Sequence, residues 1–140
     1  MILPDANVLV YAHREDADGH QEYREWLLRT IDGAHPYGVS DVVLSGFLRV
    51  VTHPRIFVRP SPLVEAVAFC DVVRSNGTAI SPGRRHWQIF TRLCTDVGAR
   101  GNVISDAFLA AMAIETNSEW ITTDRDFRRF AGLRVRHPFD

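Results

Sequence analysis

Apolar residues along the chain follow two patterns that alternate. Short apolar runs bounded by polar or turn residues are typical of strands buried in a parallel sheet. They predict strands over the residues before Asp5 and over residues 35–39, 78–80, 120–123 and 133–135. Between them, apolar residues three or four positions apart predict helices. We expect helices over residues 7–11, 20–31, 42–52, 63–75, 85–97 and from 102 or 105 to 116, with a short helical turn over residues 127–130.

The predicted helices have apolar faces that we expect to pack against the sheet. Ser40 or Asp41 caps the helix that begins at residue 42, and Pro54 stops it. Spacing predicts inward faces at Tyr23, Trp26, Leu27 and Ile31 in the second helix, at Val64, Val67, Ala68 and Val72 in the fourth, and at Trp87, Phe90, Leu93 and Cys94 in the fifth.

Strands that alternate with helices predict a parallel sheet covered by helices on both faces. We therefore expect a three-layer α/β/α fold with a central parallel sheet of four or five strands. The chain contains no internal repeat or linker-like segment, and its 140 residues are the size of one ordinary domain. Residues 1–140 are accordingly predicted to form a single domain.

Composition indicates a globular protein. Hydrophobic residues make up 46% of the sequence and charged residues 24%, which excludes a disordered chain. No apolar run approaches the roughly 18 residues of a membrane-spanning helix, and the N-terminus lacks the basic start and apolar stretch of a signal peptide. We expect a cytoplasmic protein without a membrane partner.

The cysteines and the cationic residues narrow the chemistry only a little. Cys70 and Cys94 lie in helical apolar patterns without a Cys-x-x-Cys or Cys-His arrangement, so we expect reduced core thiols. The net charge of −1 does not by itself indicate a nucleic-acid ligand. All 16 cationic side chains are Arg, a bias that we attribute to codon usage.

Carboxylates recur at comparable places along the chain. Asp5 follows the first predicted strand, Asp124 follows the strand over residues 120–123, and Asp106 lies in the first turns of a helix. Because parallel strands end at one edge of the sheet, where open α/β proteins bind ligands, we expect these acids to converge. Acids in one cleft repel one another unless a cation lies among them. Oxygen ligands without a nearby His or Cys favour Mg²⁺ or Mn²⁺.

Such a site supports metal-assisted hydrolysis of a phosphodiester. Asp106 near a helix N-terminus adds a dipole that favours its ionised form and a bound phosphate, and the alanine-rich helix that follows can lie close to the sheet. Each acid also has an ordinary structural interpretation, with Asp5 as a helix cap, Asp106 as a first-turn acid and Asp124 as a turn residue.

Four stretches combine these acids with a characteristic set of neighbours: Leu3–Leu9, Phe47–Phe57, Ser105–Ala111 and Thr122–Phe130. In residue types, order and spacing they resemble the PIN-domain nucleases, and within that family the VapC-type toxins of bacterial toxin-antitoxin pairs. The resemblance covers essentially the whole chain.

The resemblance implies a PIN-like parallel-sheet fold and Mg²⁺- or Mn²⁺-dependent endoribonuclease activity on RNA. It also implies a homodimer and inhibition by a small cognate antitoxin of the VapB type. Family roles carry over to Asp5, Asp106 and Asp124 as catalytic metal ligands, and to Asn7, Thr123 and Asp126 as catalytic-site orienting groups.

The chain departs from the family at one position. Members normally carry a glutamate, a fourth acid, directly before the Phe-Leu-Arg-Val run, and here that residue is Gly46. Asp41 is a poor substitute, because five helical residues rotate it by roughly 140° onto another face. A glycine inside a helix costs about 1 kcal/mol relative to alanine. We interpret Gly46 as an inactivating substitution that weakens metal binding and slows turnover.

Several other side chains are weighed against simpler roles. The candidates for RNA phosphate contacts, with solvated salt bridges as the alternative, are Arg14, Arg49, Arg55, Arg125, Arg128 and Arg129. The histidines are distant from the acids in sequence, and we expect capping or surface roles for them. Trp26, Trp87 and the phenylalanines are expected in the core or in a dimer interface.

Two other classes of function stay open. A catalytically inactive PIN-fold binding module would keep the fold, the dimer and the antitoxin, and Gly46 favours it. A strand-tip aspartyl phosphotransferase is disfavoured, because no second acid stands two residues after Asp5 and no Lys is suitably placed. Mg²⁺-dependent RNA cleavage that Asp5→Asn abolishes distinguishes the nuclease from both.

Overall fold

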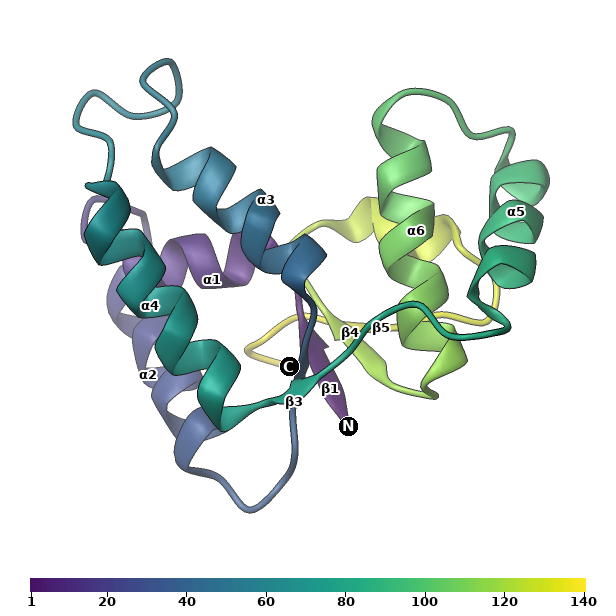
Figure 1. Cartoon of the computed structure of the whole chain (residues 1–140), viewed down its shortest axis with the longest axis horizontal. Coiled ribbons are helices and arrows are strands. Elements are labelled where there is room, and N and C mark those ends of the chain that lie inside the picture. The colour runs from purple at the N-terminus through teal and green to yellow at the C-terminus, as the bar shows by residue number, and fades with distance from the viewer.

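A parallel sheet runs through the centre of the molecule in the computed structural model, which describes residues 1–140 (Figure 1). Its middle strand, β1 (Ile2–Pro4), pairs on one side with β4 (Glu119–Ile121), which pairs with β5 (Arg134–Arg136). On the other side a bridge from Ile2 to Tyr37 joins β1 to the short pair of β2 (Gly38–Val39) and β3 (Thr78–Ala79). The strand order is β3-β2-β1-β4-β5, with every pair parallel, as predicted.

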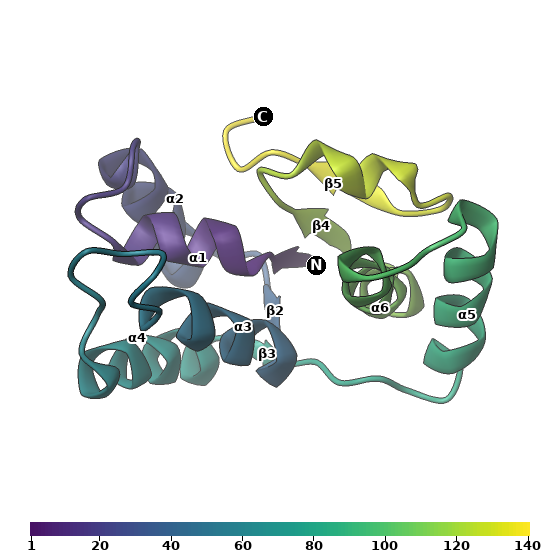
Figure 2. The same cartoon turned by 90° about the horizontal axis from the view of Figure 1, so that it is seen from above.

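Helices lie on both sides of this sheet (Figures 1 and 2). One side carries α1 (Ala6–His13), α2 (His20–Asp32), α3 (Asp41–Val51) and α4 (Leu63–Asn76), and the other carries α5 (His86–Val97) and α6 (Asn102–Glu115). The 3₁₀ turn η1 (Arg125–Arg129) connects β4 to β5. The predicted α/β/α fold is confirmed, although the strand predicted over residues 35–39 is reduced to β2. No helix combines the length and apolar character needed to cross a membrane.

Side-chain caps determine where the two helices nearest the sheet edge begin. Asp5 accepts a hydrogen bond from the Ala6 N–H at 2.7 Å and caps α1. Ser40 Oγ accepts from the backbone N–H groups of Val42 and Val43 and caps α3. Each helix therefore starts two residues after a strand ends, which places the N-termini of α1 and α3 at the same edge of the sheet.

Small residues allow close packing against the strands. A Cβ on Gly38 would lie 2.5 Å from Leu3 Cδ2 and 2.7 Å from Ile80 Cγ1, so β2 can approach β1 only with glycine there. In α6, Ala107, Ala110 and Ala111 are completely buried. The alanine-rich helix packs tightly into the core, as the sequence predicts.

The predicted inner face of α4 is wrong. All four residues of the predicted face are exposed, and the residues that α4 buries are Ala66, Cys70 and Val73. α4 is apolar around most of its circumference, so a 3.6-residue spacing does not distinguish the inner stripe from the outer one. Burial also raises the pKa of the Cys70 thiol to about 11, because the thiolate is poorly solvated.

The predicted inner face of α5 is only partly correct. Leu93 is buried as expected, together with His86 and Ile89. Trp87, by contrast, is 70% exposed. In α2 three of the four residues of the predicted face, Tyr23, Trp26 and Leu27, are buried and Ile31 is half-buried, because this helix has a single narrow apolar stripe.

Arg14 anchors the loop between α3 and α4. Its side chain is 10% exposed and forms a two-point ion pair with Asp16. The same guanidinium donates to the Arg59 carbonyl at 2.8 Å and to Ser61 Oγ at 3.2 Å, and it lies 4.0 Å above the ring of Phe57. Arg14 is thus a structural residue, which removes it from the candidates for RNA contact.

We expect Arg14→Lys to destabilise the fold by about 1–3 kcal/mol, because a single ammonium cannot replace the several hydrogen bonds that a buried guanidinium donates. Urea unfolding followed by circular dichroism measures the change. Arg74→Lys, which alters the exposed pair with Asp41, is the matched control and should leave the midpoint nearly unchanged. Equal midpoints for both variants would show that Arg14 does not anchor the loop.

Candidate functional site

Asp5 occupies the junction between the middle strand and the first helix. Its backbone N–H donates to the Ile121 carbonyl at 2.8 Å, which extends the β1–β4 ladder by one residue. Its side chain is buried, with the residue 7% exposed. The strand and the cap therefore hold this carboxylate in one place.

Thr122 and Asn7 orient the buried carboxylate. Thr122 Oγ1 donates to Asp5 Oδ2 at 2.7 Å, and Asn7 Nδ2 donates to the same oxygen at 3.2 Å. Asn7 Nδ2 also lies 3.1 Å from Thr122 Oγ1. With the Ala6 N–H on the other oxygen, both oxygens of Asp5 have hydrogen-bond donors.

The hydroxyl that reaches Asp5 belongs to Thr122, whereas the sequence pointed to Thr123. Thr123 contributes only its backbone N–H, which donates to Asn7 Oδ1 at 3.4 Å. β4 is buried on both faces, since Trp120 and Ile121 are both inaccessible. No polar alternation therefore indicated which of the two threonines points inward.

Asp124 and Asp126 follow β4 in the turn that begins η1. The backbone N–H of Asp124 donates to Thr122 Oγ1 at 3.1 Å, which ties this turn to the Asp5 network. Asp124 caps η1 by accepting from the Asp126 N–H at 2.8 Å. The Asp126 side chain is 73% exposed and lies 3.4 Å from Arg129. Asp126 therefore stands at the rim, beyond the buried network.

Asp106 comes from α6, on the opposite side of the sheet from α1. It is half-buried and lies in the second turn, because α6 begins at Asn102. The predicted helix-dipole benefit is consequently small, since that effect fades within the first turn. Burial raises the pKa of Asp106, repulsion from Asp124 adds to the increase, and Arg129 opposes it.

The acids at the sheet edge repel one another electrostatically. Burial raises the pKa of Asp5 to about 6, Thr122 and the Ala6 N–H oppose the rise, and repulsion from Asp106 and Asp124 adds to it. The three predicted ligands thus lie within electrostatic range of one another. No group of three or more Asp, Glu, His or Cys side chains is close enough to hold a metal ion together.

The donor set nevertheless fits a hard cation that keeps part of its water shell. Mg²⁺ is usually bound through one or two carboxylates and several waters, so three carboxylates in direct contact are not required. Asp5 is a buried acid whose repulsion by neighbouring acids a cation would relieve. The absence of a neighbouring thiol or imidazole agrees with an oxygen-binding ion.

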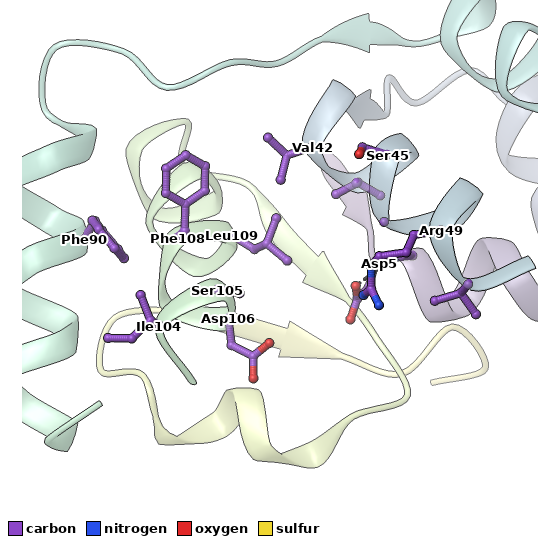
Figure 3. A pocket seen from close by; sticks show the side chains of 14 residues that line it. Asp5, Val42, Ser45, Arg49, Phe90, Ile104, Ser105, Asp106, Phe108 and Leu109 are labelled. Carbon is purple, nitrogen blue, oxygen red and sulfur yellow. Dashed lines mark hydrogen bonds between the residues drawn. The ribbon is translucent and has the colours of Figure 1, made fainter. Parts of the chain in front are cut away.

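A pocket of about 510 Å³ opens beside Asp5 and Asp106 (Figure 3). α3 forms one wall and includes Gly46 and Arg49, while α5 and α6 form the other. Asp124 instead lines a smaller polar pocket of about 280 Å³, together with Arg125 and Arg128. The acids are therefore divided between two pockets.

Gly46 faces open space in the larger pocket. A Cβ built at this position would touch only the Cβ of Ala6, at 3.9 Å, which is ordinary contact. The backbone thus has room for a longer side chain in the pocket that Asp5 and Asp106 also line. Asp41 does not replace it, because this acid is exposed and pairs with Arg74 at 2.8 Å.

The other predicted candidates divide between structural and site positions. Arg49, Arg125 and Arg128 line the two pockets next to the acids, and Arg129 pairs with Asp126. His86 is buried in the core, where its Nε2 lies 2.9 Å from the Phe108 carbonyl oxygen, rather than at the surface. Packing between α5 and α6 therefore fixes the position of His86, and the pattern of a single sequence does not predict this burial.

Residues 2–133 match the family model of the PIN domain. The chain belongs to the PIN-domain family. It is similar to VapC ribonuclease Mb2897 of Mycobacterium bovis, with 46% identity over 100% of this chain and 97% of that protein. Ribonuclease VapC31 of Mycobacterium tuberculosis is 41% identical, with 99% of each chain covered. These relatives place the PIN domain among the VapC-type proteins.

Solved structures support the same fold. The crystal structure of VapBC2 from Rickettsia felis bound to a promoter DNA fragment superimposes with a TM-score of 0.71 at 20% identity, covering 98% of both chains. VapBC-1 from nontypeable Haemophilus influenzae gives a TM-score of 0.69 at 14% identity over the full length of both chains. The PIN-domain fold predicted from the four motifs is therefore confirmed.

The raised pKa of Asp5 makes the stability of this PIN domain depend on pH. Protonated Asp5 favours the folded state, so its contribution is complete below pH 4 and is lost as pH rises through about 6. In a chelating buffer, we expect the free energy of unfolding of Asp5→Asn to rise by about 2 kcal/mol relative to that of the unsubstituted protein as pH rises from 4 to 7. Urea unfolding at each pH measures this difference.

Asp41→Asn provides a control, because the stability contribution of Asp41 depends on pH in the opposite direction. Arg74 lowers the pKa of Asp41, so that acid stabilises the fold above its ordinary pKa and loses the contribution as pH falls. A difference between Asp5→Asn and the unsubstituted protein that stays constant from pH 4 to pH 7 would contradict the burial of an ionisable Asp5.

Proposed function

We propose that the chain is a metal-dependent endoribonuclease toxin that hydrolyses RNA phosphodiester bonds and is neutralised by a cognate antitoxin. The observation that supports this most directly is the buried Asp5 carboxylate, oriented by Thr122 and Asn7 and facing the charges of Asp106 and Asp124. The relatives named VapC ribonucleases supply the substrate class. RNA and antitoxin would be encountered in the cytoplasm.

Asp5, Asp106 and Asp124 would hold Mg²⁺ or Mn²⁺, with Asp5 as the principal ligand. The bound ion supplies Lewis-acid stabilisation of phosphoryl oxygens and an activated water. Asn7, Thr122 and the Thr123 backbone keep the Asp5 oxygens in a fixed orientation, so little reorganisation is needed when a substrate binds. Asp126 acts at the rim by holding Arg129 near the acids.

A VapB-type antitoxin and a second copy of the chain are the proposed protein partners. The fold neighbours include VapBC proteins from Rickettsia felis and Haemophilus influenzae. Apolar residues of α4 stay exposed in the single chain, with Val64 at 78% and Leu63 at 62%. Exposed apolar surface of this kind is typical of an interaction face.

A catalytically inactive PIN-fold binding module is the alternative. The specific observation in its favour is the open space at Gly46, where the family carries its fourth acid. This module would keep the fold and the antitoxin but would not hydrolyse RNA. The aspartyl phosphotransferase is further disfavoured, because both Asp5 oxygens already accept hydrogen bonds in a buried site.

Cleavage of RNA tests the proposal directly. We expect the protein to cut a fluorescently labelled total-RNA extract when Mg²⁺ or Mn²⁺ is added, and to stop when the ion is chelated. Asp5→Asn should reduce the rate by at least about a hundredfold, because loss of a central ligand removes transition-state stabilisation. Asp41→Asn is the control and should cut normally. Cleavage that survives both chelation and Asp5→Asn would refute a metal-dependent site at Asp5.

Gly46→Glu tests how far the missing acid limits the enzyme. We expect about tenfold tighter Mn²⁺ binding, measured by calorimetry, together with faster RNA cleavage, because a fourth carboxylate strengthens an oxygen-ligand site. Gly46→Gln keeps the shape without the charge and should give neither gain. Gly46→Ala should stabilise the helix by about 1 kcal/mol without changing metal affinity. Equal Mn²⁺ affinity and rate for the Glu and Gln variants would show that the missing acid is not limiting.

A further inference from the structure

The pocket beside the acids is larger and more apolar than metal binding requires. Its volume is about 510 Å³, and 8 of its 14 lining residues are hydrophobic. A site that only held an ion and a phosphate group would be lined mainly by polar groups. Pockets of this size with few polar groups are typical of binding sites for small organic groups.

One wall of the pocket is an aromatic cluster with a fixed geometry. The rings of Phe90 and Phe108 meet edge to face at 5.5 Å, and His86 stacks on Phe90 at 5.9 Å. The hydrogen-bonding contact of His86 with the Phe108 carbonyl joins α5 to α6 behind this wall. Figure 3 shows Phe90, Phe108 and Leu109 on this side, across from the α3 residues.

The opposite wall, from α3, offers space and positive charge. Gly46 leaves the pocket open, since a Cβ there would touch only Ala6. Arg49 is three residues further along the same helix, is exposed, lines the same pocket and forms no salt bridge. Ser45 and Ser105 add hydroxyls to the lining. The apolar walls suit the flat faces of a nucleobase, and the two hydroxyls suit its polar edge. The unpaired guanidinium suits a phosphate group.

We propose that this pocket receives one unstacked nucleobase of a single-stranded RNA, next to the phosphodiester held at the acids. The inference rests on the proposed ribonuclease function and adds a base-binding subsite to it. Bases in single-stranded RNA are splayed out and recognised by stacking on aromatic side chains and by hydrogen bonds to their edges. Arg49 contacts the adjoining phosphate and so favours a nucleotide over an uncharged occupant.

Trp87 provides a built-in reporter of occupancy. Its ring lies 5.7 Å from that of Phe90, at the exposed end of the aromatic cluster. The other tryptophans, Trp26 and Trp120, are buried in the core. Because Phe90 lines the pocket and lies beside Trp87, we expect a base that enters the pocket to change the emission of Trp87 and to leave that of the other two largely unaffected.

The test compares RNA strands that carry the same charge with and without bases. Binding is measured by Trp87 emission and by calorimetry in the Asp5→Asn protein with Mg²⁺, so that the strands stay intact. The probes are the single-stranded pentamers rA5 and rU5 and an abasic ribose-phosphate pentamer. We expect at least one base-bearing strand to bind about tenfold more tightly than the abasic strand and to change Trp87 emission.

Two substitutions locate the subsite. Val42 lines the pocket and is 47% exposed, so Val42→Phe narrows the pocket without disturbing the core. This change should weaken the binding of base-bearing RNA by about tenfold and leave the binding of the abasic strand unaffected. Val58→Phe, at a 99% exposed position in the loop before α4 and outside the pocket, is the matched control and should change neither affinity. Phe108→Leu keeps an apolar wall but removes the ring, so it should weaken the binding of the base-bearing strands and not that of the abasic strand.

The outcomes separate this proposal from the ribonuclease function. RNA cleavage by the unsubstituted protein, combined with equal binding of base-bearing and abasic strands, would overturn the base pocket and leave the ribonuclease intact. Absence of both cleavage and RNA binding would overturn both. A shift from dimer to monomer in Val42→Phe, measured by light scattering, together with unchanged discrimination between strands, would show that a second copy fills the pocket.

Discussion

The hydrogen bond from Thr122 Oγ1 to Asp5 Oδ2 connects residues 117 positions apart, and the site depends on it. It joins the end of the first strand to the segment just after β4. The parallel register of β1 and β4, with Pro4 opposite Ile121, brings both strand ends level, and the Asp5 N–H continues that ladder. Without this contact a buried carboxylate would lack its strongest donor, and burial without donors is costly.

Burial of Asp5 determines the electrostatics of its surroundings. A carboxylate that is poorly solvated and repelled by Asp106 and Asp124 ionises less readily than an exposed one. The fold accepts this arrangement because α6 packs through small alanines and therefore brings Asp106 close to the sheet edge. Mutual repulsion of this kind is typical of functional sites, where a bound cation can relieve it.

The pocket next to the acids is asymmetric in charge. Its carboxylates are Asp5, at the end of β1, and Asp106, from α6, whereas α3 contributes Gly46 and Arg49. Glycine at position 46 therefore has two consequences, since α3 contributes no acid there and the pocket stays open in front of the aromatic wall. Position 46 therefore bears both on the number of acids beside the pocket and on the space available to a substrate.

The sequence by itself determined the order of elements, the parallel sheet and the convergence of Asp5, Asp106 and Asp124 at one edge. These follow from local periodicity and from the rule that parallel strands end together, so neither requires knowledge of side-chain packing. The poor position of Asp41 follows in the same way, because helical rotation is a local property, whereas the missing acid at Gly46 is apparent only through the resemblance to the PIN-domain nucleases.

Only the tertiary structure decided which side chains meet. The hydroxyl that reaches Asp5 is that of Thr122 and not that of Thr123. The sequence did not distinguish the two, because β4 is buried on both faces and shows no alternation of polar and apolar residues. The tertiary structure turned Ala66 and Cys70 of α4 inward, because an apolar helix has no unique inner stripe. It buried Arg14 and assembled the aromatic wall from α5 and α6. Each of these depends on distances between residues far apart in the chain, which are set by packing and not by any local pattern.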